Sequence, residues 1–187
     1  MSDCAPAGWT IENETVGDVN ADGSADVVLT LEEVNAAEGK QRGRAMIVLT
    51  AQKDSAWKSA AVADRLLQCV DCRSMMAELH IKIEKGIIVV FQAQGNNGSS
   101  MSNETYRFGL ESATSRFLLI DADYFSGSGP DKANSESTNY LTGDRETTHQ
   151  KAKQNFTTPT RVKITKTYLD DVDADNIETA AFIRFDG

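Results

Sequence analysis

Residue types that carry enzyme chemistry or bind zinc are scarce in this 187-residue chain. It has two histidines, His80 and His149, and three cysteines. Catalysis by a nucleophile needs a Ser or Cys beside a His and an orienting acid. The sequence contains no G-x-S-x-G, H-E-x-x-H or Walker motif, and neither histidine has a partner at zinc-ligand spacing. We therefore expect a protein that is not an enzyme.

Basic residues and long apolar runs are also scarce. Nineteen Lys and Arg stand against twenty-eight Asp and Glu, for a net charge of -9. This balance argues against nucleic acid and anionic membranes as partners and favours a basic protein or cations. No apolar run approaches the roughly 18 residues of a membrane-spanning helix. Residues 1–6 contain neither the basic nor the apolar part of a signal peptide.

Oxygen-bearing residues alternate along the most distinctive stretch, residues 18–26. Calcium prefers several hard oxygen ligands, and Gly23 allows the left-handed turn that folds such a loop inward. The loop is not an EF-hand, because Leu29 stands where that motif needs Glu. The alternative is a polar β-turn with local hydrogen bonds to its own backbone. The expected calcium ligands are Asp18, Asn20, Asp22, the carbonyl of Ser24, and Asp26.

Short stretches of β-branched and apolar residues recur along the chain and predict strands. Lys85-Gly86 should turn a hairpin between two of them. Residues 57–68 fit either a short helix or an irregular crossover. We expect one all-β domain over residues 1–187, an antiparallel sandwich or small propeller-like fold with at most one short helix. The expected strands are 8–12, 25–31, 44–51, 78–84, 87–93, 105–110, 116–121, 137–143 and 161–165.

Two further motifs have open interpretations. Cys69 and Cys72 form a C-x-x-C, which suits a local disulfide, half a zinc site or a redox pair. We favour the disulfide, because the motif leads into a strand instead of opening a helix. Asp171, Asp173 and Asp175 alternate near the C-terminus, either as a second cation site or as a solvated acidic tail.

Residues 121–131 read as a long loop that combines aromatic, Ser/Gly and acidic residues, which is typical of a binding loop. Its alternative is a surface insertion anchored by the two aromatics. The candidate partner-binding residues are Tyr124, Phe125, Ser126, Ser128 and Asp131.

The loop at residues 18–26 resembles the D-x-[DN]-x-D-G-x-x-D calcium loops of FG-GAP and VCBS repeats. The succession of this loop, the C-x-x-C, residues 116–123 and residues 137–143 is similar to exported bacterial proteins. These include periplasmic calcium-binding immunity proteins, which block cell-wall-degrading effectors of secretion systems, and proteinaceous lysozyme inhibitors.

The resemblance implies a non-catalytic periplasmic or secreted protein that holds Ca²⁺ and neutralises a basic, lysozyme-like effector. An open calcium loop also suits the calcium concentrations outside the cytosol. The alternative is a calcium-stabilised adhesion or carbohydrate-binding module. Such a module needs a shallow aromatic platform, and the chain has only two Trp and four Tyr.

Overall fold

Two antiparallel β-sheets make up the part of the chain that the computed structural model describes, which is residues 5–53, 56–71, 76–96, 100–128, 132–151 and 154–177. The only helical element within these residues is a short 3-10 turn, η2 (Ala174–Asn176). The prediction of an all-β, antiparallel fold is therefore confirmed. Two sheets that enclose a common core are consistent with the predicted sandwich.

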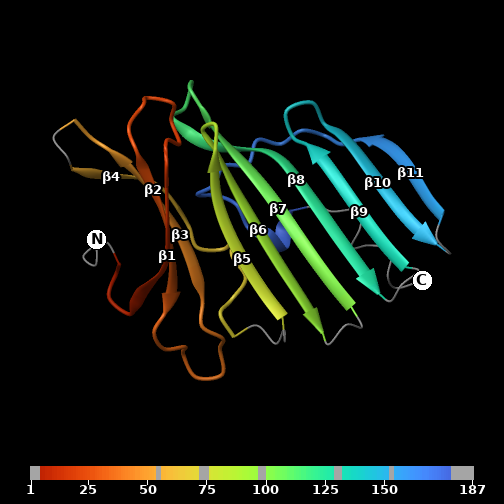
Figure 1. Cartoon of the computed structure of the whole chain (residues 1–187), viewed down its shortest axis with the longest axis horizontal. Helices are drawn as coiled ribbons and strands as arrows, with labels where there is room; N and C mark the ends of the chain where they lie inside the picture. Colours follow the sequence, from red (N-terminus) through yellow and green to blue (C-terminus); the bar gives the residue numbers. More distant parts are fainter. Residues whose placement is uncertain are drawn as a thin grey trace.

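The first sheet contains four strands in sequence order and lies on the left in Figure 1. Its two central strands are buried on both faces. Val27, Leu29 and Leu31 share one face, as predicted, and Val28 faces the other way with Val48 of the neighbouring strand. The strands are β1 (Trp9–Gly17), β2 (Asp26–Glu33), β3 (Arg44–Ala51) and β4 (Trp57–Ala63).

The second sheet contains seven strands that also follow one another in chain order. The predicted hairpin between its first two strands is confirmed. Lys85 and Gly86 form the turn with φ of 51° and 80°, as a tight hairpin requires. The strands are β5 (Met76–Glu84), β6 (Ile87–Asn96), β7 (Ser100–Glu111), β8 (Arg116–Ser128), β9 (Lys132–Asn139), β10 (Asp144–Lys151) and β11 (Gln154–Arg161).

The main core lies between the two sheets. It joins Val28 and Met46 of the first sheet to Ile88, Phe108 and other apolar residues of the second. The sheets approach each other most closely where β1 meets β5. A Cβ atom on Gly17 would lie 2.8 Å from Cβ of Ile83, so only glycine allows this approach.

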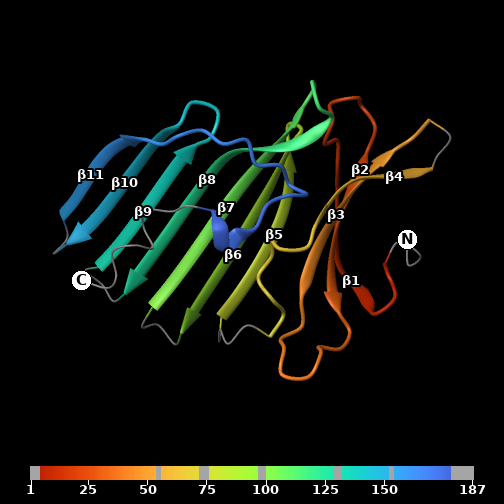
Figure 2. The same ribbon diagram turned by 180° about the vertical axis from the view of Figure 1, so that it is seen from behind.

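The segment that follows β11 returns across the seven-stranded sheet, as Figure 2 shows. It pairs with the first half of β8: the Leu119 amide donates to the carbonyl of Thr167, and the Leu169 amide donates to that of Phe117. The second half of β8 pairs with β9 instead. Leu169 and Val172 bury their side chains in the main core. Figure 1 shows the opposite face of the sheet, which no described element covers; we call it the outer face.

Several sequence predictions need correction. Residues 57–68 contain a strand, β4, and not a helix. The expected loop at 121–131 is wrong, because β8 continues to Ser128. The expected strand at 137–143 overlaps the end of β9, and residues 140–142 form a turn. The expected strand at 161–165 is also wrong, since β11 ends at Arg161. Residues 144–151 and 154–161, which lie outside the expected strands apart from Arg161, pair as β10 and β11.

Substitution Gly17→Ala should lower the free energy of unfolding by about 1–3 kcal/mol, because its new methyl group overlaps the side chain of Ile83. The measurement is urea unfolding of wild type, Gly17→Ala, Ile83→Ala and the double variant. We expect Gly17→Ala to cost less once Ile83 is shortened. Purely additive effects would contradict a steric conflict between these two positions.

Candidate functional site

The aspartate loop, residues 18–26, connects β1 to β2. Gly23 has a φ of 85°, so the predicted left-handed turn is confirmed, and Ala21 has a φ of 59°. Positive φ is strained for alanine and easy for glycine. The local hydrogen bonds described next hold the loop in this shape.

Side-chain oxygens of the aspartate loop accept hydrogen bonds from its own backbone. Asp18 Oδ2 accepts from the amide of Gly23 at 2.9 Å, and Asn20 Oδ1 accepts from that of Asp22 at 2.9 Å. Asp22 Oδ1 accepts from the Ser24 amide at 2.7 Å. The Ser24 amide, followed by the side chains of Ser24 and Asn20, lowers the pKa of Asp22 by hydrogen bonding to its carboxylate. The loop thus has the local hydrogen bonding of the polar-turn alternative.

Asp26 closes the loop from a buried position. Its carboxylate is fully buried, with Oδ2 accepting from the amide of Val19 and Oδ1 from that of Ala51, each at 2.9 Å. A buried carboxylate is costly unless it is hydrogen-bonded or paired. Asp26 therefore joins the start of the loop, the start of β2 and the end of β3.

The donor set of the loop fits calcium in its chemistry. Three carboxylates, the amide oxygen of Asn20 and the carbonyl of Ser24 are hard oxygen ligands, and a carboxylate that accepts one N–H retains further lone pairs. Within the described residues, no three His, Cys, Asp or Glu side chains are gathered closely as a metal site. The bound calcium stays a prediction.

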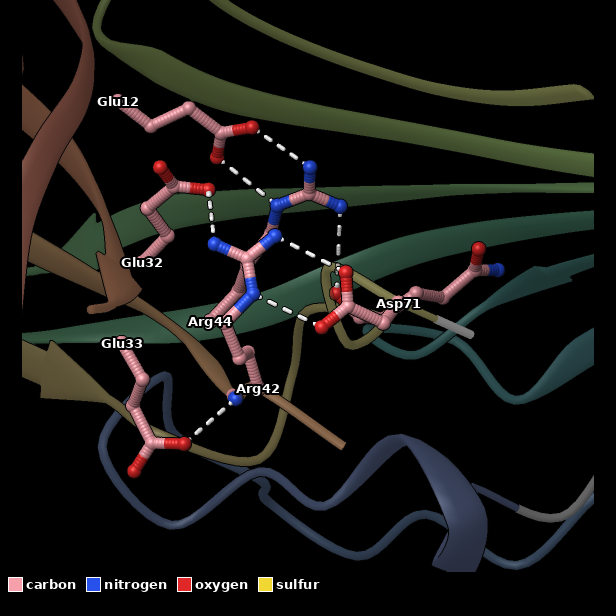
Figure 3. Close-up of polar contacts among 8 residues, drawn as sticks. Glu12, Glu32, Glu33, Arg42, Arg44 and Asp71 are labelled. Carbon is pink, nitrogen blue, oxygen red and sulfur yellow. Dashed lines mark hydrogen bonds and ion pairs between the residues drawn. The ribbon is translucent and has the colours of Figure 1, made fainter. Parts of the chain in front are cut away.

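An ionic cluster fastens the connection after β4 to the first sheet (Figure 3). Arg44 forms a two-pronged pair with Glu12, at 2.6 and 2.8 Å. Arg42 forms another with Asp71, at 2.8 and 2.9 Å, and Glu32 lies 3.8 Å from its guanidinium. The hydrogen bond from Arg42 lowers the pKa of Asp71. The Arg42–Asp71 pair thus holds the connection against the segment before β3, and the Arg44–Glu12 pair joins β3 to β1.

Cys69 lies in this fastened connection and is disulfide-bonded. Both other cysteines, Cys4 and Cys72, lie outside the described residues, and so does the predicted pairing of Cys69 with Cys72.

The candidate partner-binding residues do not form a loop. Tyr124, Phe125, Ser126 and Ser128 belong to β8, and Asp131 lies outside the described residues. Because side chains alternate along a strand, Tyr124 is buried on the inner face and Phe125 is half-buried on the outer face. The candidate residues therefore cannot all face the same partner.

Sequence reasoning missed a shallow hollow of about 440 Å³ on the outer face. One guanidinium nitrogen of Arg107, Nη1, lies 2.5 Å from Asp121 Oδ1 and 2.6 Å from Asp123 Oδ2. Burial, with the neighbouring charge of Asp123, raises the pKa of Asp121. Asp121 and Asp123 are two positions apart, so a strand through these residues places both carboxylates on one face. We expected a loop here, and the two carboxylates were therefore not placed together from the sequence.

Acidic residues near the C-terminus have basic partners. Arg116 pairs with Asp170 at 2.8 Å and with Asp171 at 2.5 Å, and its guanidinium lies 4.1 Å from the centre of the Tyr168 ring. Asp173 pairs with Arg65 at 3.1 Å. Asp171 and Asp173 therefore fasten the returning segment, and the side chain of Asp175 lies outside the described residues.

The two histidines lie on different strands of the second sheet, His80 on β5 and His149 on β10. The ring of His80 is exposed on the outer face and stacks on Phe91, with ring centres 6.0 Å apart. His149 Nδ1 lies 2.7 Å from Oδ1 of Asn134.

Comparison with protein families, with curated proteins and with solved structures gives no match for this chain. The resemblance to immunity proteins and lysozyme inhibitors therefore stays a prediction. Within the described residues, no helix has the length and apolar character needed to cross a membrane.

Glu111 should make stability depend on pH. Its carboxylate accepts hydrogen bonds from Lys166, Tyr168 and Thr114, which lower its pKa from 4.5 to about 2, Lys166 having the largest effect. A pKa lowered by folding stabilises the folded state above pH 4.5. That contribution should disappear as the pH falls from 4.5 to about 2.

The measurement is urea unfolding of wild type and Glu111→Gln between pH 7 and pH 2. We expect Glu111→Gln to be less stable at neutral pH, with the difference shrinking as the medium becomes acidic. Glu38→Gln, in the exposed connection between β2 and β3, serves as the control. A stability difference that is the same at every pH would contradict the assigned pKa.

Proposed function

We propose that this protein is a non-catalytic inhibitor that binds and neutralises another protein, as a periplasmic or secreted immunity protein against a cell-wall-degrading, lysozyme-like effector. The observation that carries the proposal is the outer face of the seven-stranded sheet, which no described element covers (Figure 1). Strands are more rigid than loops, so binding on this face would order little backbone.

The charge of the outer face favours a basic partner. Strand pairing places seven acidic and four basic side chains on it. An acidic face attracts a basic protein over long range and speeds association. The acidic residues are Glu78, Glu84, Glu111, Asp121, Asp123, Asp144 and Glu146, and the basic ones are Lys82, Arg107, Arg116 and Arg161.

Calcium has a structural part in this proposal. Asp18, Asn20, Asp22, the Ser24 carbonyl and Asp26 would hold the ion, which supplies the positive charge that offsets their carboxylates. The loop lies directly before β2, and its closing residue bonds to the end of β3. An ion there would stabilise the first sheet, while the binding face belongs to the second.

The alternative is an adhesion or carbohydrate-binding module. The stack of His80 on Phe91, on the same outer face as the half-buried Phe125, is the observation that favours it. Sugars pack on exposed aromatic rings, and this row is the nearest to such a platform among the described residues.

The proposed function predicts binding to, and inhibition of, a basic cell-wall hydrolase, such as the product of a neighbouring gene. The measurements are isothermal titration and lysis of cell-wall suspensions with and without this protein. We expect stoichiometric binding that weakens as salt rises, because charges on the two surfaces are screened. Binding to cell-wall glycan with no effect on any hydrolase would instead support the alternative module.

Calcium should raise the melting temperature. A ligand that binds only the folded state stabilises it by RT ln(1 + [L]/Kd), about 2.7 kcal/mol at a hundredfold excess over Kd. Thermal unfolding is measured in EDTA and with added Ca²⁺, and magnesium serves as the ion control. Asp22→Ala should abolish the calcium response. Wild type that melts at the same temperature with chelator and with Ca²⁺ would end the calcium proposal.

A further inference from the structure

Two motifs that the sequence presents separately meet at the hollow on the outer face. Ile120, Asp121 and Asp123 come from residues 116–123, and Ser137, Asn139 and Leu141 come from residues 137–143. Strand pairing brings them together, because Asp121 pairs with Asn139 and Asp123 with Ser137. The two stretches thus build one site with Arg107 of β7.

A β-bulge and a turn shape this hollow. The register between β7 and β8 shifts after Arg107, which pairs with Asp121, while the next residue, Phe108, pairs with Leu119. Ile120 is the additional residue and lies beside Asp121 at the hollow. Bulges commonly redirect side chains next to functional sites.

The turn after β9 forms the rim. Asn139 Oδ1 accepts from the amides of Leu141 and Thr142, at 2.9 and 3.0 Å. Gly143 follows with a φ of 79°, and a Cβ there would lie 2.7 Å from the carbonyl oxygen of Val162, so the turn requires glycine. This turn presents Leu141, whose side chain is 57% exposed, beside the carboxylates.

The charge within the hollow is unbalanced. One guanidinium lies between two carboxylates, and all three side chains are between a quarter and two-fifths exposed: Arg107 36%, Asp121 28% and Asp123 38%. Within the described residues, the second oxygen of each carboxylate accepts no hydrogen bond. The site therefore has one excess negative charge and two directed acceptors within reach of solvent.

We propose that this hollow receives a lysine or arginine side chain of the basic protein partner, an inference that rests on the proposed function. The cationic head hydrogen-bonds the free oxygens of Asp121 and Asp123, and its aliphatic stem packs on Leu141 and Ile120. A bare metal ion fits less well, because the Arg107 guanidinium stands between the carboxylates. An anion is repelled by both carboxylates.

The first test needs no natural partner. Amide resonances of ¹⁵N-labelled protein are followed while acetyl-Gly-Lys-Gly-amide is added, with acetyl-Gly-norleucine-Gly-amide as the uncharged control. We expect the largest shifts at Arg107, Asp121, Asp123 and Asn139, and their loss in Asp121→Asn/Asp123→Asn. Shifts that are spread evenly over the acidic surface, or that persist in the double variant, would overturn the inference.

The second test uses the hydrolase that wild type binds. Asp121→Asn/Asp123→Asn should weaken binding about tenfold, since it removes carboxylates that pair with the incoming cation. Asp64→Asn, a highly exposed carboxylate outside the sheet, is the matched control and should change affinity less than about twofold. Leu141→Arg, which places a cation at the rim, should also weaken binding in a variant that keeps both carboxylates.

The outcomes separate the two proposals. If wild type binds the hydrolase and both hollow variants bind equally well, the hollow inference fails and the proposed function stands. If wild type binds no hydrolase, the proposed function fails, and the peptide titration still decides whether the hollow takes a lysine side chain. Melting temperatures of the variants show that each is folded.

Discussion

The buried carboxylate of Asp26 is the interaction on which the arrangement of the first sheet depends. Its two oxygens accept hydrogen bonds from the amides of Val19 and Ala51, which are far apart in sequence. Val19 is fully buried in the main core, so the clamp also fixes where β1 leaves the core. Gly17, two residues earlier, lies against Ile83 of the second sheet. One buried acid thus positions the aspartate loop and the junction of the two sheets.

The second sheet reaches rigidity by a different route, because much of its interior is polar. Arg145 lies 3.2 Å from Glu136, both are nearly fully buried, and Arg145 donates to Thr138 at 2.9 Å. A buried ion pair contributes little net stability, but separating it is costly, so it holds the strands in register. The outer face therefore rests on a backbone held in register by buried side chains, which suits the protein binding proposed for it.

Local sequence patterns predicted some elements of the fold correctly and others wrongly. Lys85-Gly86 between two alternating stretches predicts its hairpin, and Gly23 predicts the left-handed turn, because both depend on neighbours in the chain. The second half of β8 and strands β9 to β11 were largely missed. Buried positions of β9 and β10 hold residues such as Glu136, Thr138 and Arg145, which pair across strands. When the buried positions of a strand hold polar residues that bond to distant partners, the sequence lacks the alternation of apolar and polar residues that predicts a strand. The hollow was missed for the same reason, since Asp121 meets Arg107 and Asn139 only through strand pairing.

The two neighbours of β8 have a consequence for how the chain folds. Its second half pairs with β9, the next strand along the chain. Its first half forms backbone hydrogen bonds with Thr167 and Leu169, about 50 positions further along the chain. Closing so large a loop costs conformational entropy before any contact compensates for it. The half of β8 that carries Asp121 and Asp123 can therefore form early, whereas the half that seals the core is completed late. During synthesis, this part of the outer face can therefore take shape before the hydrophobic core is closed.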